Sequence, residues 1–540
     1  MAETGTAGEL ITLALQRAGV EHLFTLNGAH IWPMLTGAEE HGIRILDVRH
    51  EQSAAFAAEG MAKLTRRCGV ASVTAGPGVT NTISAIATAR FNDSPVFVVG
   101  GRSPASRWGL GSLQEIDHQP LVRSLTKTAQ TLGSAEDAYR AGAEGVRIAL
   151  SQRSGPTFLD VPFDTFFSSA DAPEATEHLT VDMGAEPDPD QLKLAAELLK
   201  GARSPLVIAG GTVWWAGAER DLVRFVECAG APVLLNGLAR GMLPPGHPLF
   251  RSRARSTAFK GADVVFVVGA PLDFRFGFGE GFRDDAKLVY VDVDDYRKHR
   301  NPEAAIYGDL RRALAALAKL VEGAPRRQEW LDKLAEAEAA GRAKDRAMTE
   351  SDSAPVHPAR LVAEVDRFCD PDAILIGDGG DFVSFAGRLV ERREPGLWMD
   401  AGPFGCLGAG PGYAMAATMA HPDRQVLLLS GDGAFGFSAM EFDTMVRHRL
   451  PVVCVVGNNG IWALEKHPMQ NLLSTSIAAD LGPRTRYDRV VEALGGYGEL
   501  VERPGEIGPA LRRAFDAGVP ACVNVLMDPT AEYPRSAMLM

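Results

Sequence analysis

The sequence lacks the features that mark several large classes of protein. Its 540 residues include six cysteines, none in a C-x-x-C pair, which does not fit a disulfide framework or a cysteine-based zinc site. The longest apolar runs, such as 264–270, fall far short of the roughly 20 residues that span a membrane. The first residues show no charged and apolar leader. We therefore expect a cytoplasmic protein with reduced thiols and no membrane segment.

Positive charge is also scarce. The chain has 55 Lys and Arg against 68 Asp and Glu, a formal net charge of −13. Nucleic acids and anionic membranes attract basic surfaces, so we expect neither as a partner. A small molecule is the expected ligand. Any phosphate on it would be held by backbone N–H groups, a metal ion or a few placed cations.

Short β-branched runs alternate with amphipathic helical stretches along almost the whole chain. Such continuous apolar runs predict parallel strands buried on both faces. The predicted strands are 44–48, 70–74, 96–99, 205–209, 264–268, 288–293, 374–376, 425–429 and 451–456. An acidic, Pro-rich stretch at 169–190 and a solvated charged helix with a linker at 323–356 interrupt the pattern. The predicted fold class is α/β, with three doubly wound parallel-sheet domains at 1–170, 188–325 and 355–540.

The strongest chemical signal lies in the third block. Asp432, within Gly-Asp-Gly, follows the predicted strand 425–429, and Asn459, the second Asn of a pair, follows 451–456. Because ligands bind at the carboxyl ends of parallel strands, we expect both side chains at one site. Carboxylate and amide oxygens suit Mg²⁺, and the glycines let the backbone approach a diphosphate. The pattern predicts a magnesium–diphosphate site.

A second Gly-Asp-Gly stands at 377–379. Only Asp432 is followed 27 residues later by an Asn at a strand end, whereas the same step from Asp378 reaches Gly405. The turn 377–381 is therefore either a second loop around the diphosphate or a plain strand-to-helix turn.

The GDG…NN spacing resembles the cofactor signature of thiamine-diphosphate (ThDP) enzymes of the acetolactate synthase and pyruvate decarboxylase superfamily. The resemblance covers essentially the whole chain and implies a pyrimidine-binding, a middle and a diphosphate-binding domain in that order. It implies Mg²⁺ on Asp432, Asn459 and the main-chain oxygen of Ile461. Besides these ligands, the implied cofactor-binding residues are Glu51, Pro77, Asn81, Gly380, Asp381, Gly405, Leu407, Gly431, Gly433 and Ala434.

Glu51 follows the predicted strand 44–48 and precedes a helical stretch. Alone it could be a helix N-terminal carboxylate. The resemblance of its R-H-E segment implies that Glu51 hydrogen-bonds N1′ of the aminopyrimidine and favours the imino form that removes the C2 proton. It also implies Leu407 beneath the thiazolium, where relatives often carry Met, and the Gly405 carbonyl on the 4′-amino group. Since the family builds each site from two subunits, it implies a homo-oligomer, with a tetramer expected.

Three segments bear on the substrate. The G-A-H-I segment with Ala29 and His30 and the Leu113-Gln114 pair resemble benzaldehyde lyase, and Glu465 matches an active-site Glu of pyruvate decarboxylases. We expect His30, Gln114 and Glu465 to act with Glu51 in catalysis, and Ala29 and Leu113 to join them in binding substrate. The alternatives are a capped loop histidine, core packing of Leu113 and a solvent-facing Glu465.

Other segments resemble the 2-hydroxyacyl-CoA lyase and oxalyl-CoA decarboxylase branch. They are FGFSAME (435–441), GAPLDFRFGFG (269–279) and the tail PRSAMLM. Arg275, Arg283 and Arg535 are candidate CoA-binding residues, with surface arginines as the alternative. AGGTVWWAG (209–217) looks like the first turn of a nucleotide-binding unit. ADP, CoA or FAD is therefore a candidate ligand of the middle domain.

The expected activity is that of a ThDP- and Mg²⁺-dependent carbon–carbon lyase or carboligase. Our leading interpretation is a 2-hydroxyacyl-CoA lyase that releases formyl-CoA and an aldehyde or ketone. One alternative is an acetolactate-synthase-like decarboxylating carboligase of 2-keto acids, whose F-Q-E-x-D segment is partly matched by LQEID. The other is a benzaldehyde-lyase-like acyloin lyase. A non-catalytic paralogue would be expected to lose Glu51 or the Asp432/Asn459 pair, and all three residues are present.

Overall fold

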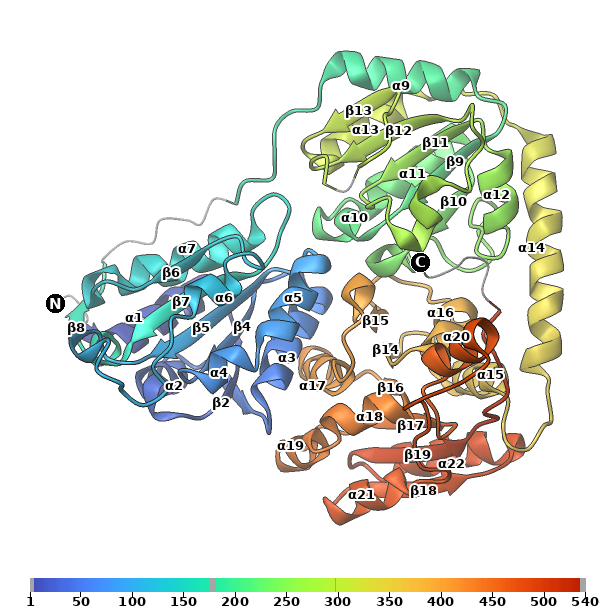
Figure 1. Ribbon diagram of the computed structural model, residues 1–540. Helices are drawn as coiled ribbons and strands as arrows, with labels where there is room; N and C mark the ends of the chain where they lie inside the picture. Colours follow the sequence, from blue (N-terminus) through green and yellow to red (C-terminus); the bar gives the residue numbers. More distant parts are fainter. Residues whose placement is uncertain (1–3, 174–180, 297, 535–540) are drawn as a thin grey trace.

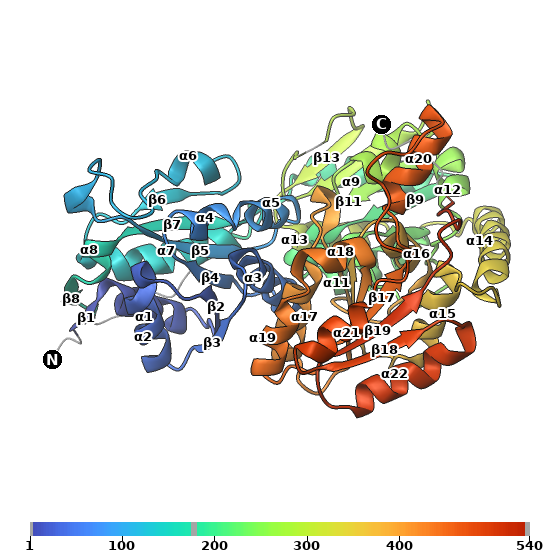
Figure 2. The same ribbon diagram turned by 60° about the horizontal axis from the view of Figure 1, so that its bottom comes forward.

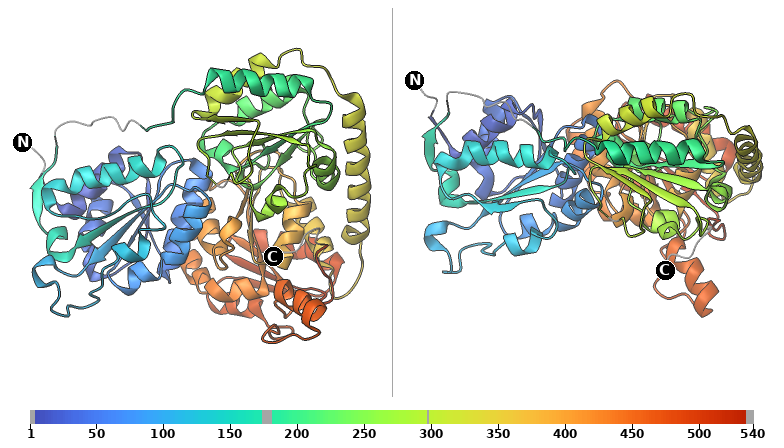
Figure 3. Two further views of the ribbon diagram at one scale, coloured as in Figure 1. Left: turned by 45° about the horizontal axis from the view of Figure 1, so that its top comes forward. Right: turned by 90° about the horizontal axis from the view of Figure 1, so that it is seen from above.

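Three parallel β-sheets, each covered by helices on both faces, form three bodies arranged as a triangle (Figures 1 and 3). The computed structural model describes residues 4–173, 181–296 and 298–534. The N-terminal body lies on the left of Figure 1, the middle body at the upper right and the C-terminal body at the lower right. The predicted fold class is confirmed. The exact domain boundaries stay a prediction.

The N-terminal sheet has six parallel strands in the order β3-β2-β4-β5-β7-β6. Its strands are β2 (His22–Leu26), β3 (Arg44–Asp47), β4 (Gly69–Val73), β5 (Val96–Arg102), β6 (Ala129–Thr131) and β7 (Thr157–Pro162). Its helices are α1 (Ala7–Arg17), α2 (Trp32–Glu40), α3 (Glu51–Thr65), α4 (Pro77–Thr80), α5 (Ile83–Phe91), α6 (Gln119–Val122), α7 (Ala138–Leu150) and α8 (Phe163–Phe166).

The middle sheet has five parallel strands in the order β10-β9-β11-β12-β13. Its strands are β9 (Pro205–Ala209), β10 (Val233–Leu235), β11 (Val264–Val268), β12 (Lys287–Asp292) and β13 (Ala304–Tyr307). Its helices are α9 (Pro189–Gly201), α10 (Gly211–Trp215), α11 (Glu219–Ala229), α12 (Arg255–Gly261) and α13 (Leu310–Leu320).

The C-terminal sheet has six parallel strands in the order β15-β14-β16-β17-β19-β18. Its strands are β14 (Ile374–Asp378), β15 (Trp398–Asp400), β16 (Val426–Gly431), β17 (Val453–Asn458), β18 (Tyr497–Val501) and β19 (Ala521–Leu526). The helices that follow α13 are α14 (Gln328–Thr349), α15 (Pro358–Phe368), α16 (Asp381–Leu389), α17 (Gly410–Ala420), α18 (Asp432–Ser438), α19 (Glu441–Arg447), α20 (Ala463–Leu473), α21 (Tyr487–Ala493) and α22 (Ile507–Asp516).

All three sheets place their first strand between the second and the third in chain order. The chain therefore leaves the first and third strands in opposite directions, which opens a crevice at their carboxyl ends. These crevices lie between β2 and β4, between β9 and β11, and between β14 and β16. They are where the topology favours a ligand.

Helices α3 and α17 pack against each other and join the N-terminal body to the C-terminal one (Figure 2). Glycines permit the close approach: a Cβ at Gly412 would lie 2.7 Å from the Cβ of Phe56, and one at Gly60 would lie 2.9 Å from the Cα of Tyr413. Phe56 and Tyr413 are fully buried in one core shared by both bodies. The start of α3 is thereby fixed relative to the C-terminal sheet.

The two predicted linkers differ from expectation. Within the acidic stretch, β8 (Ser169–Asp171) pairs antiparallel with β1 (Thr4–Thr6), so the beginning and the end of the N-terminal segment are joined by a two-stranded sheet. Helix α14 is present, but it is not wholly solvated: Glu338 is buried and accepts backbone N–H groups of Arg253 and Ala254. It runs along the edge of Figure 1 from the middle to the C-terminal body. No helix of the described chain is long and apolar enough to cross a membrane.

Candidate active site

The residues predicted to hold a metal lie together at the carboxyl edge of the C-terminal sheet. Strands β16 and β17 are neighbours with Gly431 opposite Gly457, so the turns after them meet. Asp432 Oδ2 accepts the backbone N–H of Gly460 at 2.8 Å, and Asn459 Oδ1 accepts that of Ile461 at 3.2 Å. One network of short bonds thus brings Asp432 beside the Asn459–Ile461 turn.

These donors fit a magnesium ion. They are a carboxylate, an amide oxygen and a main-chain carbonyl, all hard oxygen ligands. Burial raises the pKa of Asp432 to about 6, opposed only by backbone hydrogen bonds, and a divalent cation would offset that cost. The described residues contain no cluster of three or more His, Cys, Asp or Glu able to hold a metal.

The two Gly-Asp-Gly turns lie against each other, but their aspartates have different partners. A Cβ at Gly379 would stand 3.2 Å from the backbone nitrogen of Gly431. Asp378 points away from this contact, because its two carboxylate oxygens accept the N–H groups of Gly408 at 3.0 Å and Gly410 at 2.8 Å. Asp378 therefore anchors the 405–410 loop, and Asp432 is the carboxylate available to a metal.

The glycine-rich turns form the walls of the β14–β16 crevice. Gly380 is the residue before α16, which begins at Asp381, and a Cβ on Gly380 would lie 3.1 Å from the Cβ of Leu464 on α20. Helix N-termini and open backbone N–H groups favour anions. Gly433 and Ala434 lie in the first turn of α18, where Ala434 is buried. This arrangement suits a diphosphate.

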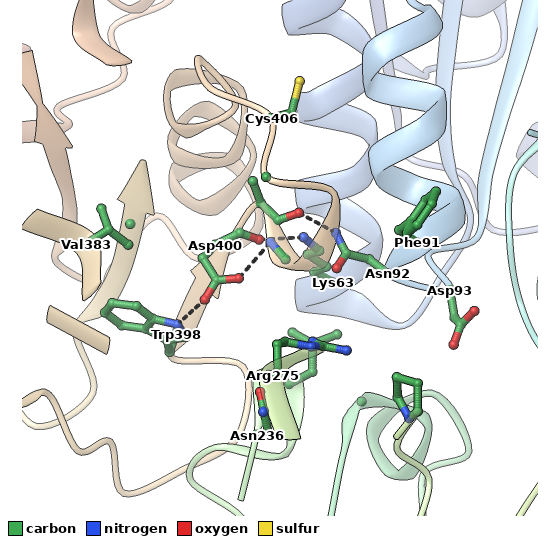
Figure 4. A pocket seen from close by; sticks show the side chains of 18 of the residues that line it. Lys63, Phe91, Asn92, Asp93, Asn236, Arg275, Val383, Trp398, Asp400 and Cys406 are labelled. Atoms are coloured by element: carbon green, nitrogen blue, oxygen red, sulfur yellow. Dashed lines mark hydrogen bonds between the residues drawn. The ribbon is translucent and has the colours of Figure 1, made fainter. Parts of the chain in front are cut away.

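The loop 400–407 is held from behind by the N-terminal body (Figure 4). Lys63 Nζ donates to the carbonyl of Asp400 at 2.9 Å, and Asn92 Nδ2 donates to that of Ala401 at 3.1 Å. Lys63 also pairs with buried Glu59 at 3.1 Å. Farther along the loop, Gly405 is exposed and Leu407 is half-buried. Residues of α3 and the turn after α5 thus set the position of this loop.

A cavity of about 330 Å³ lies where the three bodies meet (Figure 4). Gly211 and Gly269, which follow β9 and β11, line it at the crevice of the middle sheet, and Gly380 and Gly405 line its other side. Arg275 also lines it, with its guanidinium paired to Asp273 at 2.8 Å. The cavity therefore connects the β9–β11 crevice of the middle sheet with the β14–β16 crevice of the C-terminal sheet.

The other arginines predicted to bind CoA are less informative. Arg283 is paired with Asp285 at 2.5 Å on the surface and does not line the cavity. Arg535 lies outside the described residues, as does most of the tail motif.

Glu51 is the first residue of α3 and is 7% exposed. Its Oε2 accepts a hydrogen bond from Asn81 Nδ2 at 3.0 Å. Asn81 follows the short helix α4, which begins at the exposed Pro77. The structure therefore joins two of the predicted cofactor residues in one partly buried contact, outside the lining of the 330 Å³ cavity.

His30 and Gln114 lie around the turn after β4. His30 is 7% exposed, and its Nδ1 lies 3.1 Å from Thr74 Oγ1; burial lowers the pKa of His30, which favours a neutral imidazole. Gln114 has a left-handed backbone with φ of 60° and packs against Gly76, where a Cβ would lie 2.8 Å from the Cβ of Gln114. Both residues therefore contact the turn that follows β4, His30 at Thr74 and Gln114 at Gly76.

The remaining predicted substrate residues are exposed. Ala29 lies on the surface next to His30, and Leu113 is 77% exposed, so Leu113 is not a core residue in the single chain. Glu465 is exposed in the first turn of α20, in the C-terminal body. Among the described residues no hydrogen bond links Glu465 to His30 or Gln114. One chain alone does not assemble all of the predicted pocket.

Two residues that the sequence analysis did not single out support this site. His118 is fully buried against the turn that carries Gly76, and Glu441 binds the backbone of residues 49 and 50, immediately before Glu51. Glu441 lies within FGFSAME, a segment that predicted the 2-hydroxyacyl-CoA lyase branch but no role for this residue. No spacing rule connects either residue to its partner.

Comparison with known proteins agrees with the three-sheet architecture. Three family models match: "Thiamine pyrophosphate enzyme, N-terminal TPP binding domain" over residues 5–121, its "central domain" over 192–317 and its "C-terminal TPP binding domain" over 378–525. The "Acetolactate synthase large subunit IlvG" of Mycobacterium tuberculosis is 51% identical over 541 residues, covering 100% of this chain and 98% of that protein. The "2-hydroxyacyl-CoA lyase 2" of Caenorhabditis elegans and that of Homo sapiens are each 33% identical, covering 97% of this chain and 90% of the relative. From the strand-end motifs, the matching sheets and these similarities we conclude that the chain belongs to the thiamine pyrophosphate enzyme family.

Proposed function

We propose that the chain is an acetolactate-synthase-type enzyme that joins two 2-keto acids with loss of CO₂. The observation that carries this proposal is the 51% identity to an acetolactate synthase large subunit along the full length of both chains. This similarity favours the decarboxylating carboligase over the 2-hydroxyacyl-CoA lyase that was our leading interpretation from the sequence. With pyruvate, two molecules would give one acetolactate and one CO₂.

In this proposal residues 1–170 bind the pyrimidine, 188–325 form the middle domain and 355–540 bind the diphosphate and Mg²⁺. Asp432, Asn459 and the carbonyl of Ile461 would hold the metal, as their chemistry fits it. When bound, ThDP supplies a nucleophilic carbon and an electron sink for decarboxylation. The residues that would bind ThDP, as the resemblance implies, lie at the turns after β3, β4, β14, β15, β16 and β17.

The protein's own groups would handle protons and orientation. Glu51, buried and held by Asn81, would exchange a proton with the aminopyrimidine ring. His30 has Nδ1 occupied by Thr74, so Nε2 is the nitrogen that remains for a substrate hydroxyl. Gln114 would orient the substrate oxygen, and Leu113 leaves more room than a Phe would.

We further propose that two copies of the chain complete each active site, in a homo-oligomer expected to be a tetramer. Leu113, beside Gln114, is 77% exposed, and Phe437, on α18 beyond Asp432, is 62% exposed. Apolar side chains of this size next to a catalytic crevice favour burial against a partner. Glu465 would reach the pocket of His30 and Gln114 in that arrangement.

All six cysteines are free, which supports a cytoplasmic location.

The cavity between the three bodies supports a second ligand of the middle domain, with ADP, CoA or FAD as candidates. It opens at the β9–β11 crevice, where sheets of this order bind nucleotides. FAD would be seen directly, because purified protein carrying it absorbs near 450 nm, roughly where flavins absorb.

A 2-hydroxyacyl-CoA lyase is the second candidate. Its support is the 33% identity to 2-hydroxyacyl-CoA lyase 2 over almost the whole chain and the placement of Arg275 at the cavity. A benzaldehyde-lyase-like activity has only the segments around His30 and Leu113 in its favour.

The deciding experiment incubates the purified protein with ThDP, Mg²⁺ and pyruvate, and measures acetolactate and CO₂. A parallel reaction with a short 2-hydroxyacyl-CoA is followed for formyl-CoA by mass spectrometry, and the Glu51→Gln variant is the control in both. Acetolactate that depends on Glu51 supports the proposal. Formyl-CoA without acetolactate would replace it with the lyase.

A further inference from the structure

His118 is a buried histidine with both ring nitrogens engaged. Its Nε2 accepts the backbone N–H of Gly76 at 3.0 Å, and its Nδ1 lies 2.9 Å from Asp160 Oδ1. Both His118 and Asp160 are fully buried. A backbone N–H can only donate, so Nε2 carries no proton and the hydrogen of the neutral ring is on Nδ1. The contacts on the two sides therefore specify one tautomer.

The second carboxylate oxygen of Asp160, which does not face His118, is bound by Arg102. Asp160 Oδ2 accepts from Arg102 at 2.6 Å, and Arg102 also pairs with Asp117 at 3.2 Å. The Arg102 guanidinium stacks over the ring of Trp108 at 3.7 Å. Asp160 thus binds Arg102 with one carboxylate oxygen and faces Nδ1–H with the other, and it orients the imidazole as a carboxylate orients a histidine in other enzymes.

The turn that contains Gly76, whose N–H group His118 accepts, contacts or carries several of the predicted site residues. Gly76 is buried with φ of 59° and packs directly against Gln114. Two residues before it, Thr74 contacts His30. After it, α4 leads to Asn81, the partner of Glu51. A shift of the Gly76 peptide would therefore displace side chains on both sides of the β2–β4 crevice.

We propose that His118 is a positioning residue that sets the turn 74–81, and through it Gln114 and the Asn81–Glu51 pair, without acting on the substrate. Its role in turnover rests on the proposed function, whereas its hold on the turn does not. The charged and titratable groups that face it are Asp160 on β7, Arg102 at the end of β5, Asp117 next to it in sequence, and His30 across the turn. With both nitrogens occupied, the ring has none left for a reacting atom.

Two substitutions distinguish the contact of His118 with Gly76 from its contact with Asp160. In His118→Gln the longer side chain places a carbonyl oxygen near the position of Nε2, where it accepts the Gly76 N–H. In His118→Asn the shorter amide reaches Asp160 and leaves the Gly76 N–H buried without an acceptor. An unsatisfied buried donor costs far more than a weakened hydrogen bond. The pair therefore reports specifically on the Gly76 contact.

The first measurement is hydrogen–deuterium exchange of the unliganded protein, which requires no turnover. We expect His118→Asn to speed exchange in peptides covering 74–81 by about 10-fold or more, and His118→Gln to stay within about 3-fold of the wild type. Peptides of the distant middle sheet serve as the internal control. Equal exchange in the turn for both variants would overturn the proposal.

The second measurement is kinetic. A displaced turn misplaces Gln114, so His118→Asn is expected to raise the KM for the keto acid and lower kcat, reducing kcat/KM by about 10- to 100-fold, whereas His118→Gln keeps most of it. A Gln variant as impaired as the Asn variant would contradict the proposal. Absence of acetolactate from the wild type, with the exchange pattern intact, would refute only the proposed function.

A third measurement covers the case in which His118→Asn does not fold. In wild-type protein with ¹⁵N-labelled histidine, the ring nitrogen shifts of His118 should show the hydrogen on Nδ1 and none on Nε2, because Nε2 accepts the Gly76 N–H. The Asp160→Asn variant replaces the carboxylate that faces Nδ1–H, so the ring nitrogen signals that move in this variant are those of His118. An Nε2–H tautomer or a charged ring in the wild type would overturn the assignment.

Discussion

The carboxylate of Glu441 accepts the backbone N–H of His50, with 3.1 Å between Oε1 and the nitrogen. Its other oxygen accepts the N–H of Arg49 at 3.1 Å and the hydroxyl of Thr444 at 2.7 Å. Because residues 49 and 50 immediately precede Glu51, the C-terminal body determines where α3 begins. Burial raises the pKa of Glu441, yet these donors are arranged for its ionised form.

Substituting Glu441 should weaken both stability and activity. In Glu441→Gln an NH₂ group replaces one acceptor and faces the backbone N–H groups of residues 49 and 50, at a cost of about 1–3 kcal/mol. We expect a lower Tm by differential scanning fluorimetry and a reduced kcat. Asp423→Asn, at an exposed carboxylate, is the control and should leave both unchanged. An unaltered Tm in Glu441→Gln would show that the contact contributes little.

Substituting Glu51 should abolish turnover without unfolding the protein. The side-chain oxygen of the new Gln can still accept from Asn81, so the Tm is expected to change little. The group that exchanges a proton is lost, and kcat should fall by about 100-fold or more. Steady-state kinetics with ThDP at saturation provides the measurement. Turnover at the wild-type rate would rule out Glu51 as the activating acid.

The two Gly-Asp-Gly aspartates should respond differently to the same change. Asp432→Asn removes the only carboxylate of the proposed metal site and should raise the Mg²⁺ concentration for half-maximal ThDP binding by about 10-fold or more. Trp462, packed against Gly433, offers a fluorescence signal for that binding. Asp378→Asn should lower the Tm instead, because Asp378 anchors Gly408 and Gly410. A larger Mg²⁺ effect for Asp378→Asn would reverse the assignment.

Asp378 should also give the protein a recognisable pH dependence. Burial raises its pKa from 3.8 to about 6, so the folded state binds the proton more tightly than the unfolded state. This contribution to stability is complete below about pH 4 and is lost as the pH rises through 6, a change of about 3 kcal/mol.

The Asp378 variant isolates this contribution. The Tm of the wild type relative to Asp378→Asn should be higher at pH 5 than at pH 7.5, since only the wild type gains from protonation at this position. A Tm difference that stays constant would mean that the pKa of Asp378 is near its ordinary value, and one that grows towards pH 7.5 would contradict a raised pKa.

The strands were the most predictable part of the fold. The predicted runs 205–209 and 264–268 coincide with β9 and β11, because strands buried on both faces are apolar at every position. The Asp432 and Asn459 pair was predictable for a related reason: in a parallel sheet the ends of successive strands lie on one edge, so residues that follow neighbouring strands meet.

The choice between activities was less predictable. The short segment around Phe437 favoured the 2-hydroxyacyl-CoA lyase branch and the segment around Leu113 favoured benzaldehyde lyase, whereas identity along the whole chain favours acetolactate synthase. A few residues on exposed crevice loops vary with little effect on folding, so they discriminate between relatives less well than the whole chain does.

By itself the sequence determined the class of the sheets, the position of the glycine-rich turns and the meeting of Asp432 with the Asn459 turn, because periodicity and strand-end positions are local. Only the tertiary structure decided that Asp378 anchors a loop, that Glu441 holds the residues before Glu51, and that His118 holds Gly76. Each of these is a bond from a buried side chain to backbone N–H groups of another turn or element. A backbone N–H is the same in every residue except proline, so such a bond leaves no pattern in the partner's sequence.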